Sequence, residues 1–289
     1  MDKIIKEKIA SLLANDEDIL SVEQLGGMTN QNYLVKTSAK QYIVKFFGKG
    51  TDKLINRQNE KFNLELLKDL KLDVENYLFD IEAGIKVNQY IENAETLDSA
   101  TIKTKFEKIA PILQTIHASG KELKGEFAPF EEIKKYESLI QGEIYYPNYE
   151  AVRKSVFSLK DQLEEIGIDK KSCHIDLVPE NFIEGPDGHL YLIDWEYSSM
   201  NDPMWDLAAL FLESEFTIAE EEEFLSLYES DKTPVSREKI RIYKILQDII
   251  WSLWTIYKEE NGADFGDYGI SRYNRAMNEL NYKGGTYEN

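Results

Sequence analysis

The hydrophobic pattern of the chain changes along its length, and these changes restrict the folds that it can adopt. Between Ser21 and about residue 91, apolar and polar residues alternate as in half-buried strands, for example in NYLVKTSAKQYIVKFF, with one helical stretch over residues 54–70. From Ile102 onward apolar residues recur at helical spacing, apart from the stretch CHIDLVPENFIEGPDGHLYLIDWEY. The pattern predicts an α+β fold in which a sheet-rich part precedes a mainly helical part with one embedded hairpin.

The expected elements can be placed by residue range. The first part contains a helix over 2–14 and a strand over 21–25. Two further strands flank a turn at 37–40, and two more span 77–81 and 85–90. The second part contains helices that begin near residue 102 and then span about 130–141, 148–166, 203–213, 219–229, 236–260 and 270–281. The embedded hairpin joins Asn181–Glu184 to Leu190–Ile193 through a Pro-Asp-Gly turn. We therefore expect a domain boundary near residue 91.

The charge of the chain excludes one large class of partners. It carries 34 Lys and Arg against 53 Asp and Glu, a net charge of −19. Nucleic acid is bound by clustered cationic side chains, so we expect no nucleic-acid partner, and the acidic surface favours a small cationic ligand. The one cysteine, Cys173, cannot form an intramolecular disulfide, and no apolar run reaches about 20 residues. These features predict a cytoplasmic protein without integral membrane contact. The sequence does not fix the oligomeric state, so a monomer and a homodimer both stay open.

The embedded hairpin carries the residues best suited to phosphoryl transfer. Asp176 precedes it, and the hairpin is expected to return Asp194 beside Asn181. Two carboxylates and an amide form a set of hard oxygen ligands that suits Mg²⁺ bridged to phosphates. Phosphoryl transfer also needs an aspartate that orients the attacking hydroxyl group and accepts its proton. Each residue taken alone is compatible with a turn cap or a strand end, but the ordered set predicts an Mg²⁺-dependent phosphotransferase.

The pattern H-x-D-x-x-x-x-N followed by I-D-W resembles the catalytic and metal loops of the protein-kinase-like fold, most closely the branch of choline/ethanolamine kinases and aminoglycoside phosphotransferases. The resemblance implies a two-lobed fold. A small antiparallel-sheet N-lobe, residues 1–91, would bind the nucleotide and include the hinge, and a larger, mainly helical C-lobe, residues 92–289, would bind choline and carry the catalytic residue. In this family pattern Asp176 is the catalytic base, and Asn181 and Asp194 hold Mg²⁺.

Several neighbouring residues gain an expected role from the same resemblance. His174 would brace the catalytic loop and Asp206 would stabilise it, whereas Arg272 is a candidate to pair with a carboxylate near the substrate pocket. Protein kinases have H-R-D and D-F-G where this chain has H-I-D and D-W-E, which argues against a protein substrate.

The resemblance also implies that the N-lobe supplies the nucleotide site. A double glycine between two strands lets the backbone approach phosphates closely. Lys45 matches the lysine that binds the α- and β-phosphates, and its expected partner is Glu60, with Glu65 as the alternative. The segment Gln89–Ile91 resembles the hinge whose backbone groups contact adenine. The residues assigned to ATP are Gly26, Gly27, Thr29, Asn30, Lys45, Glu60, Gln89, Tyr90 and Ile91.

A group of aromatic residues near the C-terminus indicates the substrate. Trp251 and Trp254 share one face of a helix, which is usual for a core, but Phe265, Tyr268 and Tyr273 follow closely. A quaternary ammonium cannot donate a hydrogen bond, so proteins bind it with aromatic faces and nearby carboxylates. The segments DWEYSSMNDPMWDLAALFLE and WSLW are similar to those of choline kinases. This similarity implies a choline pocket formed by Asp176, Glu196, Tyr197, Glu213, Trp251, Trp254 and Tyr268.

Together these resemblances predict transfer of the γ-phosphate of ATP to the hydroxyl group of choline, giving phosphocholine and ADP. Similarity to bacterial choline kinases implies that phosphocholine then enters cell-surface glycopolymers. Three alternatives stay open: a kinase of ethanolamine, whose primary ammonium favours carboxylates such as Glu196 and Glu213, a kinase of aminoglycosides or other small alcohols, and a choline-binding module without catalysis.

Overall fold

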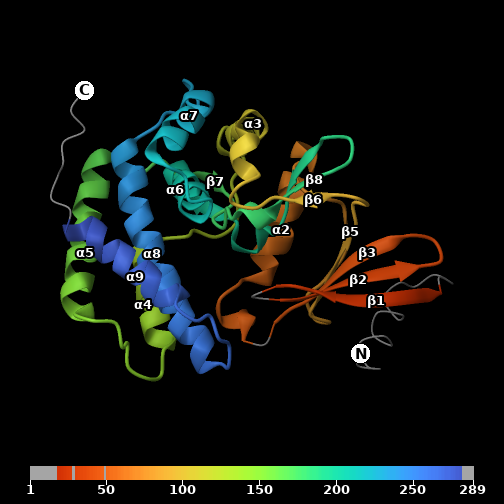
Figure 1. Cartoon of the computed structure of the whole chain (residues 1–289), viewed down its shortest axis with the longest axis horizontal. Helices are drawn as coiled ribbons and strands as arrows, with labels where there is room; N and C mark the ends of the chain where they lie inside the picture. Colours follow the sequence, from red (N-terminus) through yellow and green to blue (C-terminus); the bar gives the residue numbers. More distant parts are fainter. Residues whose placement is uncertain (1–17, 28–29, 49, 282–289) are drawn as a thin grey trace. The chain divides into compact units, whose positions relative to one another are not determined.

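The computed structural model describes residues 18–27, 30–48 and 50–281 (Figure 1). The expected helix over 2–14 and Thr29 lie outside these residues. The chain forms two compact units: the first runs to Asp98 and includes Glu180–Tyr197, and the second comprises Ser99–Pro179 and the residues from Ser198 onward. The embedded hairpin therefore belongs to the first unit, whereas a division at residue 91 places it in the second part.

An antiparallel sheet forms the centre of the first unit, in which three strands lie side by side in Figure 1. The strand order is β1 (Ile19–Leu25), β2 (Gln31–Thr37), β3 (Gln41–Phe46), β5 (Ile85–Gln89) and β4 (Asn76–Asp80). All of these strands match the predicted ranges closely. Alternating residues of β2, β3 and β5 form a buried cluster, because successive side chains of a strand point to opposite faces. This cluster consists of Tyr33, Val35, Tyr42, Val44, Ile85 and Val87.

The hairpin is part of the first unit because its backbone pairs there on two sides. Strand β8 (Phe182–Glu184) pairs with β9 (Leu190–Leu192) and with the two-residue strand β6 (Glu95–Thr96). The N–H of Leu192 also donates to the carbonyl of Leu72 at 2.8 Å. A strand as short as β6 has no readable period, so the sequence pattern does not predict this pairing.

Helix α2 (Arg57–Leu67) also belongs to the first unit. Its N-cap is Asn56, whose side chain accepts hydrogen bonds from the backbone of Gln58 and Asn59. The predicted range of 54–70 is longer because a 3-10 turn, Lys68–Leu70, continues the helical pattern beyond the helix itself.

The second unit is mainly helical. Helix α8 (Arg237–Glu260) is its centre and packs against α4 (Pro129–Leu139), α5 (Tyr149–Ile166), α6 (Pro203–Glu213) and α9 (Tyr268–Asn281) (Figure 1). The remaining helices are α3 (Phe106–His117) and α7 (Ile218–Tyr228). All of these helices were predicted, with small shifts at their ends. Strands β7 (Lys171–Cys173) and β10 (Ser199–Asn201) were not, because three residues carry no usable period.

None of the helices in the described residues has both the length and the apolar composition needed to cross a bilayer.

The two glycines before β2 differ in the space around them. A Cβ on Gly27, whose φ is +154°, would lie 2.6 Å from Nδ2 of Asn32 and 2.7 Å from the carbonyl oxygen of Asn30. A Cβ on Gly26 would meet nothing within 4 Å. Only the second glycine is therefore required by the local packing.

We expect Gly27→Ala to lower the free energy of unfolding by about 1–3 kcal/mol, because the added methyl group forces the loop to shift. The matched control, Gly26→Ala, should change it by less than about 0.5 kcal/mol. Urea unfolding of the two variants and the unchanged protein measures both values. Equal losses for the two variants would contradict this account of the loop.

Candidate active site

The predicted catalytic loop, residues 174–178 of the second unit, is held by one buried carboxylate. Asp206 of α6 is 0% exposed and accepts hydrogen bonds from the backbone N–H groups of His174 and Ile175, both at 2.8 Å. Its Oδ2 also lies 3.0 Å from Nε2 of His117, whose Nδ1 is 2.7 Å from the hydroxyl of Tyr228. Asp206 thus has the loop-stabilising position that the family resemblance implied.

The backbone of this loop is strained immediately before Asp176. Ile175 has a φ of 77°, in the left-handed region that a β-branched residue rarely adopts. The indole of Trp205 donates to the carbonyl of Ile175 at 3.0 Å, and Asp206 accepts from its N–H. These bonds hold the N–H and the carbonyl group of Ile175, which belong to the peptide units before and after the residue. The strain fixes the direction in which the chain enters Asp176, which is half-buried.

Asn181 and Asp194 flank the same end of the hairpin in the first unit. The register pairs Phe182 with Leu192, and the N–H of Ile193 donates to the carbonyl of Asn181 at 2.8 Å. The expectation that the hairpin returns Asp194 beside Asn181 is therefore confirmed. The two side chains offer a carboxylate and an amide oxygen, the hard ligands that Mg²⁺ prefers.

Lys45 contacts a different carboxylate from the one predicted. Its Nζ lies 2.5 Å from Oδ1 of Asp194, and the lysine is 6% exposed. The predicted partner, Glu60, instead accepts from Nζ of Lys86 at 2.7 Å and from Nη1 of Arg57 at 2.6 Å. The alternative partner, Glu65, is exposed. The predicted pairing of Lys45 with an acid of α2 is therefore wrong.

The register of the sheet explains this exchange of partners. Lys45 of β3 lies directly opposite Lys86 of β5, and both side chains are buried. Two like charges opposite each other destabilise a sheet unless each is paired. Glu60 pairs with one lysine and Asp194 with the other. Burial alone would raise the pKa of Glu60, but the charges of Lys86 and Arg57 outweigh burial and hold it below the ordinary range.

Asp73 is a further carboxylate of this region, and the sequence analysis missed it. It follows Leu72, whose carbonyl accepts from β9. Burial raises the pKa of Asp73 to about 7, with the charge of Lys86 opposing that rise and the charge of Asp194 adding to it. An isolated aspartate before a strand carries no sequence signal that distinguishes it from a turn residue.

Arg57, which the sequence analysis also missed, connects the glycine loop to Glu196, two residues after the proposed metal ligand Asp194. Its Nη1 donates to Oε2 of Glu196 at 2.9 Å, and its Nη2 donates to Oδ1 of Asn30 at 2.9 Å. Asn30 in turn donates to Glu196 at 2.7 Å. The guanidinium lies 4.0 Å from the ring centroid of Phe47. All three polar side chains are buried.

This buried network includes two residues with a predicted ligand contact, Glu196 and Asn30. Glu196 is 6% exposed, and its carboxylate is bound by Asn30 and Arg57, so its contact with choline stays a prediction. Burial raises the pKa of Glu196, and the charge of Asp194 adds to the rise. The side chain of Asn30 is bound in the same network, and its contact with a phosphate stays a prediction. Tyr197, the last residue of the first unit, is half-buried.

The predicted hinge begins where the sheet ends. Gln89 is the last residue of β5, opposite Tyr42, and its side chain accepts from the N–H of Glu75 at 3.2 Å. Tyr90 and Ile91 follow outside the strand and are half-buried. The contact of this segment with adenine stays a prediction.

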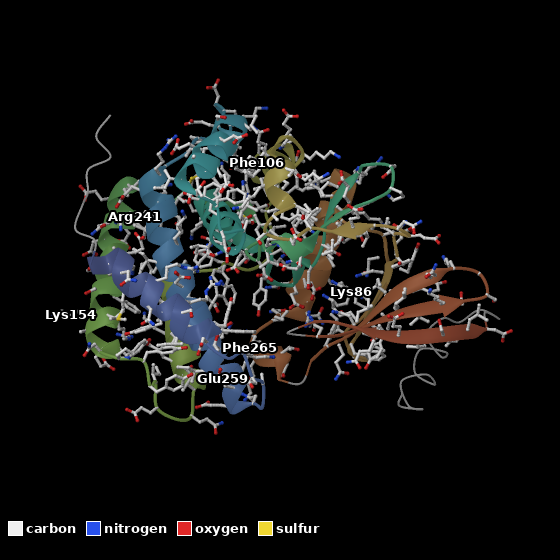
Figure 2. The ribbon with its side chains drawn as sticks, viewed as in Figure 1. Lys86, Phe106, Lys154, Arg241, Glu259 and Phe265 are labelled. Atoms are coloured by element: carbon white, nitrogen blue, oxygen red, sulfur yellow. The ribbon has the colours of Figure 1, made fainter. Side chains whose placement is uncertain are left out.

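The predicted aromatic group forms a continuous cluster in the second unit. Trp251 and Trp254 are 9% and 5% exposed, with their rings nearly perpendicular and the centroids 6.4 Å apart. The ring centroid of Phe265, which is labelled in Figure 2, lies 4.9 Å from that of Trp254 and 6.5 Å from that of Tyr268. The indole Nε1 of Trp254 is buried and has no hydrogen-bond partner among the described residues. Tyr273 is separate, because it stacks on Tyr146 at 4.6 Å.

One end of this aromatic cluster is charged. Nη1 of Arg272 donates to Oε1 of Glu213 at 2.5 Å and to the hydroxyl of Tyr268 at 2.8 Å. Burial raises the pKa of Tyr268 to about 12; Arg272 opposes the rise, and the charges of Glu213 and Asp176 add to it. The charge of Asp176, the predicted base, therefore acts on one residue of the aromatic cluster.

The fold and these residues define a class, the protein-kinase-like phosphotransferases, whose known structures share this architecture. More specifically, the chain belongs to the choline/ethanolamine kinase family, whose model matches residues 22–241.

Individual relatives agree with this assignment. The chain is similar to Protein LicA of Haemophilus influenzae, with 31% identity over 268 residues that cover 89% of this chain and 78% of that protein. It is 78% identical to the crystal structure of choline kinase LicA from Streptococcus pneumoniae, with a TM-score of 0.93 and coverage of 96% of this chain and 98% of that one. A structure of LicA in complex with AMP is also 78% identical, with a TM-score of 0.92 and coverage of 97% and 98%.

We expect Arg57→Met to lower the free energy of unfolding by about 3–5 kcal/mol, because it leaves the buried carboxylates of Glu60 and Glu196 short of a cation. Lys134→Met is the matched control, since its pair with Glu131 lies on the surface and should contribute nothing measurable. Urea unfolding compares the two. A loss for Arg57→Met no larger than that of the control would show that the network contributes little.

We expect Asp206→Asn to reduce kcat for ATP turnover by about 10²-fold, because an amide cannot accept from both loop N–H groups and the loop shifts. Asp202→Asn is the control: this acid is the N-cap of α6 and pairs with Lys239 at 2.7 Å. It should lower stability and leave kcat nearly unchanged. Similar losses of kcat in the two variants would argue against a specific action on the catalytic loop.

Proposed function

We propose that the protein is a choline kinase, which transfers the γ-phosphate of ATP to the hydroxyl group of choline and releases phosphocholine and ADP. The observation that carries this proposal is the aromatic cluster of Trp251, Trp254, Phe265 and Tyr268, in which the charge of Asp176 adds to the raised pKa of Tyr268. Family membership and the high identity to the choline kinase LicA of Streptococcus pneumoniae support it. The related complex with AMP supports a nucleotide as the second substrate.

In the proposed reaction Asp176 accepts the proton of the choline hydroxyl. The hydroxyl oxygen then forms a bond to the γ-phosphorus, and the bond between that phosphorus and the bridging oxygen of ADP breaks. The bonds from Asp206 to the catalytic loop keep Asp176 in one orientation during this step. Lys45, buried beside Asp194, places a fixed positive charge where the phosphates are proposed to bind.

Asn181 and Asp194 would hold Mg²⁺. Their amide and carboxylate oxygens lie at one end of the hairpin, and their chemistry matches the oxygen ligands that this ion requires. When bound, Mg²⁺ neutralises charge on the phosphate oxygens.

The aromatic cluster fits a quaternary ammonium. The ammonium group of choline has no N–H, so it needs no hydrogen-bond acceptor, and each contact of the cation with an aromatic face contributes about 0.5–2 kcal/mol. The ring planes of Trp251 and Trp254 are 87° apart and offer faces in two directions. Resemblance further supports a place in the bacterial cytoplasm, with phosphocholine supplied to cell-surface glycopolymers.

The test is ADP release with ATP and Mg²⁺, in which choline, ethanolamine and an aminoglycoside are compared. We expect choline to have the highest kcat/KM. Trp254→Ala should lose most of this value, and Trp254→Phe, which keeps an aromatic face, should retain more of it. Asp176→Ala should abolish turnover and still bind nucleotide in a calorimetric titration.

Other results would redirect the proposal. Preference for ethanolamine or an aminoglycoside would keep the kinase and reject choline as the substrate. Choline binding without any ADP release would identify a binding module instead. Near-normal turnover by Asp176→Ala would exclude Asp176 as the base.

A further inference from the structure

A row of alternating charges lies beside the aromatic cluster in the second unit. Arg272, 4% exposed, pairs with Glu213 at 2.5 Å, and its Nε lies 3.2 Å from Oδ1 of Asp248. Arg275 closes the row with two hydrogen bonds to Asp248, both at 2.6 Å. Two carboxylates and two guanidinium groups leave no net charge. The net charge of the row therefore does not attract a cation. Its effect on a bound ligand depends on which of its acceptor oxygens already accept a hydrogen bond.

Arg272 occupies two of the acceptor oxygens at this end of the cluster. Its Nη1 donates both to the carboxylate of Glu213 and to the hydroxyl of Tyr268. The indoles of Trp251 and Trp254 have only N–H donors, and phenylalanine has no polar atom. With Arg272 in place, Oε1 of Glu213 and the hydroxyl oxygen of Tyr268 are already engaged. The cluster thus presents aromatic faces and few available acceptors.

This arrangement affects two related substrates differently. A primary ammonium carries three N–H donors, and losing their hydrogen bonds with water is costly unless acceptors replace them. A quaternary ammonium carries none and loses nothing when acceptors are absent. We propose that Arg272 is a specificity-determining residue that favours a quaternary over a primary ammonium by occupying Oε1 of Glu213 and the hydroxyl oxygen of Tyr268. It acts as a positioning residue, and the inference rests on the proposed function.

The test measures kcat/KM for choline and for ethanolamine with Arg272→Met, a side chain of similar length without charge or donors. Releasing a carboxylate for a charged hydrogen bond should lower the choline-to-ethanolamine ratio by about tenfold or more. The change should arise mainly from a lower KM for ethanolamine, with KM for ATP unchanged. A ratio measured on one preparation does not depend on how much of the protein is folded.

Three further variants separate the mechanism from simpler effects. Arg275→Met removes the same charge and touches the same Asp248, but not Glu213 or Tyr268, so it should leave the ratio unchanged. Arg272→Lys keeps a cationic donor and should retain most of the preference. Arg272→Gln, which can still donate to Asp248, should lower the ratio as Arg272→Met does and is the substitute if the methionine variant does not fold.

The outcomes are distinct. An unchanged ratio in both neutral Arg272 variants overturns the inference while choline kinase activity stands. An equal fall with Arg275→Met also overturns it, because charge alone would then explain the result. If the unchanged protein turns over neither choline nor ethanolamine, the proposed function fails, and this inference fails with it.

Discussion

The buried carboxylate of Asp206 is the interaction on which the catalytic part of the second unit depends. Ile175 adopts a left-handed backbone conformation that costs energy for a β-branched residue, and the loop keeps it only because Asp206 and Trp205 bond to its peptide groups. Since Asp176 is the next residue, its orientation follows from this strained turn. The contact of Asp206 with His117 extends the constraint to α3, so the position of the catalytic carboxylate depends on the packing of helices distant in sequence.

In the first unit the corresponding constraint is a pair of lysines opposite each other in the sheet. Lys45 and Lys86 are buried on neighbouring strands, and each needs its own carboxylate. Lys86 forms an ion pair with Glu60, and Lys45 forms one with Asp194 at the end of the hairpin. The same principle applies at the aromatic cluster. There the buried guanidinium of Arg272 pairs with the carboxylate of Glu213. The other side chains of the cluster are aromatic.

Much of this organisation could be predicted from the sequence, and the exceptions have physical causes. The alternation of apolar residues located the sheet, and the helical spacing located α3 to α9, because both periods are long enough to read. The order and spacing of Asp176, Asn181 and Asp194 indicated phosphoryl transfer. The structure confirmed that the hairpin brings the last two together. Strands of two or three residues were missed, and with them the pairing that assigns the hairpin to the first unit.

The sequence by itself thus determined which chemical groups are available: the catalytic and metal-binding oxygens, the lysines and the aromatic side chains. Only the tertiary structure decided how the charged groups are shared. It assigned Glu60 to Lys86, Glu196 to Arg57 and Asn30, and Glu213 to Arg272. The physical reason is that each ion pair depends on strand register and helix packing between segments far apart in the chain. A local pattern shows that a carboxylate is present, but which cation it meets depends on distances that exist only after folding.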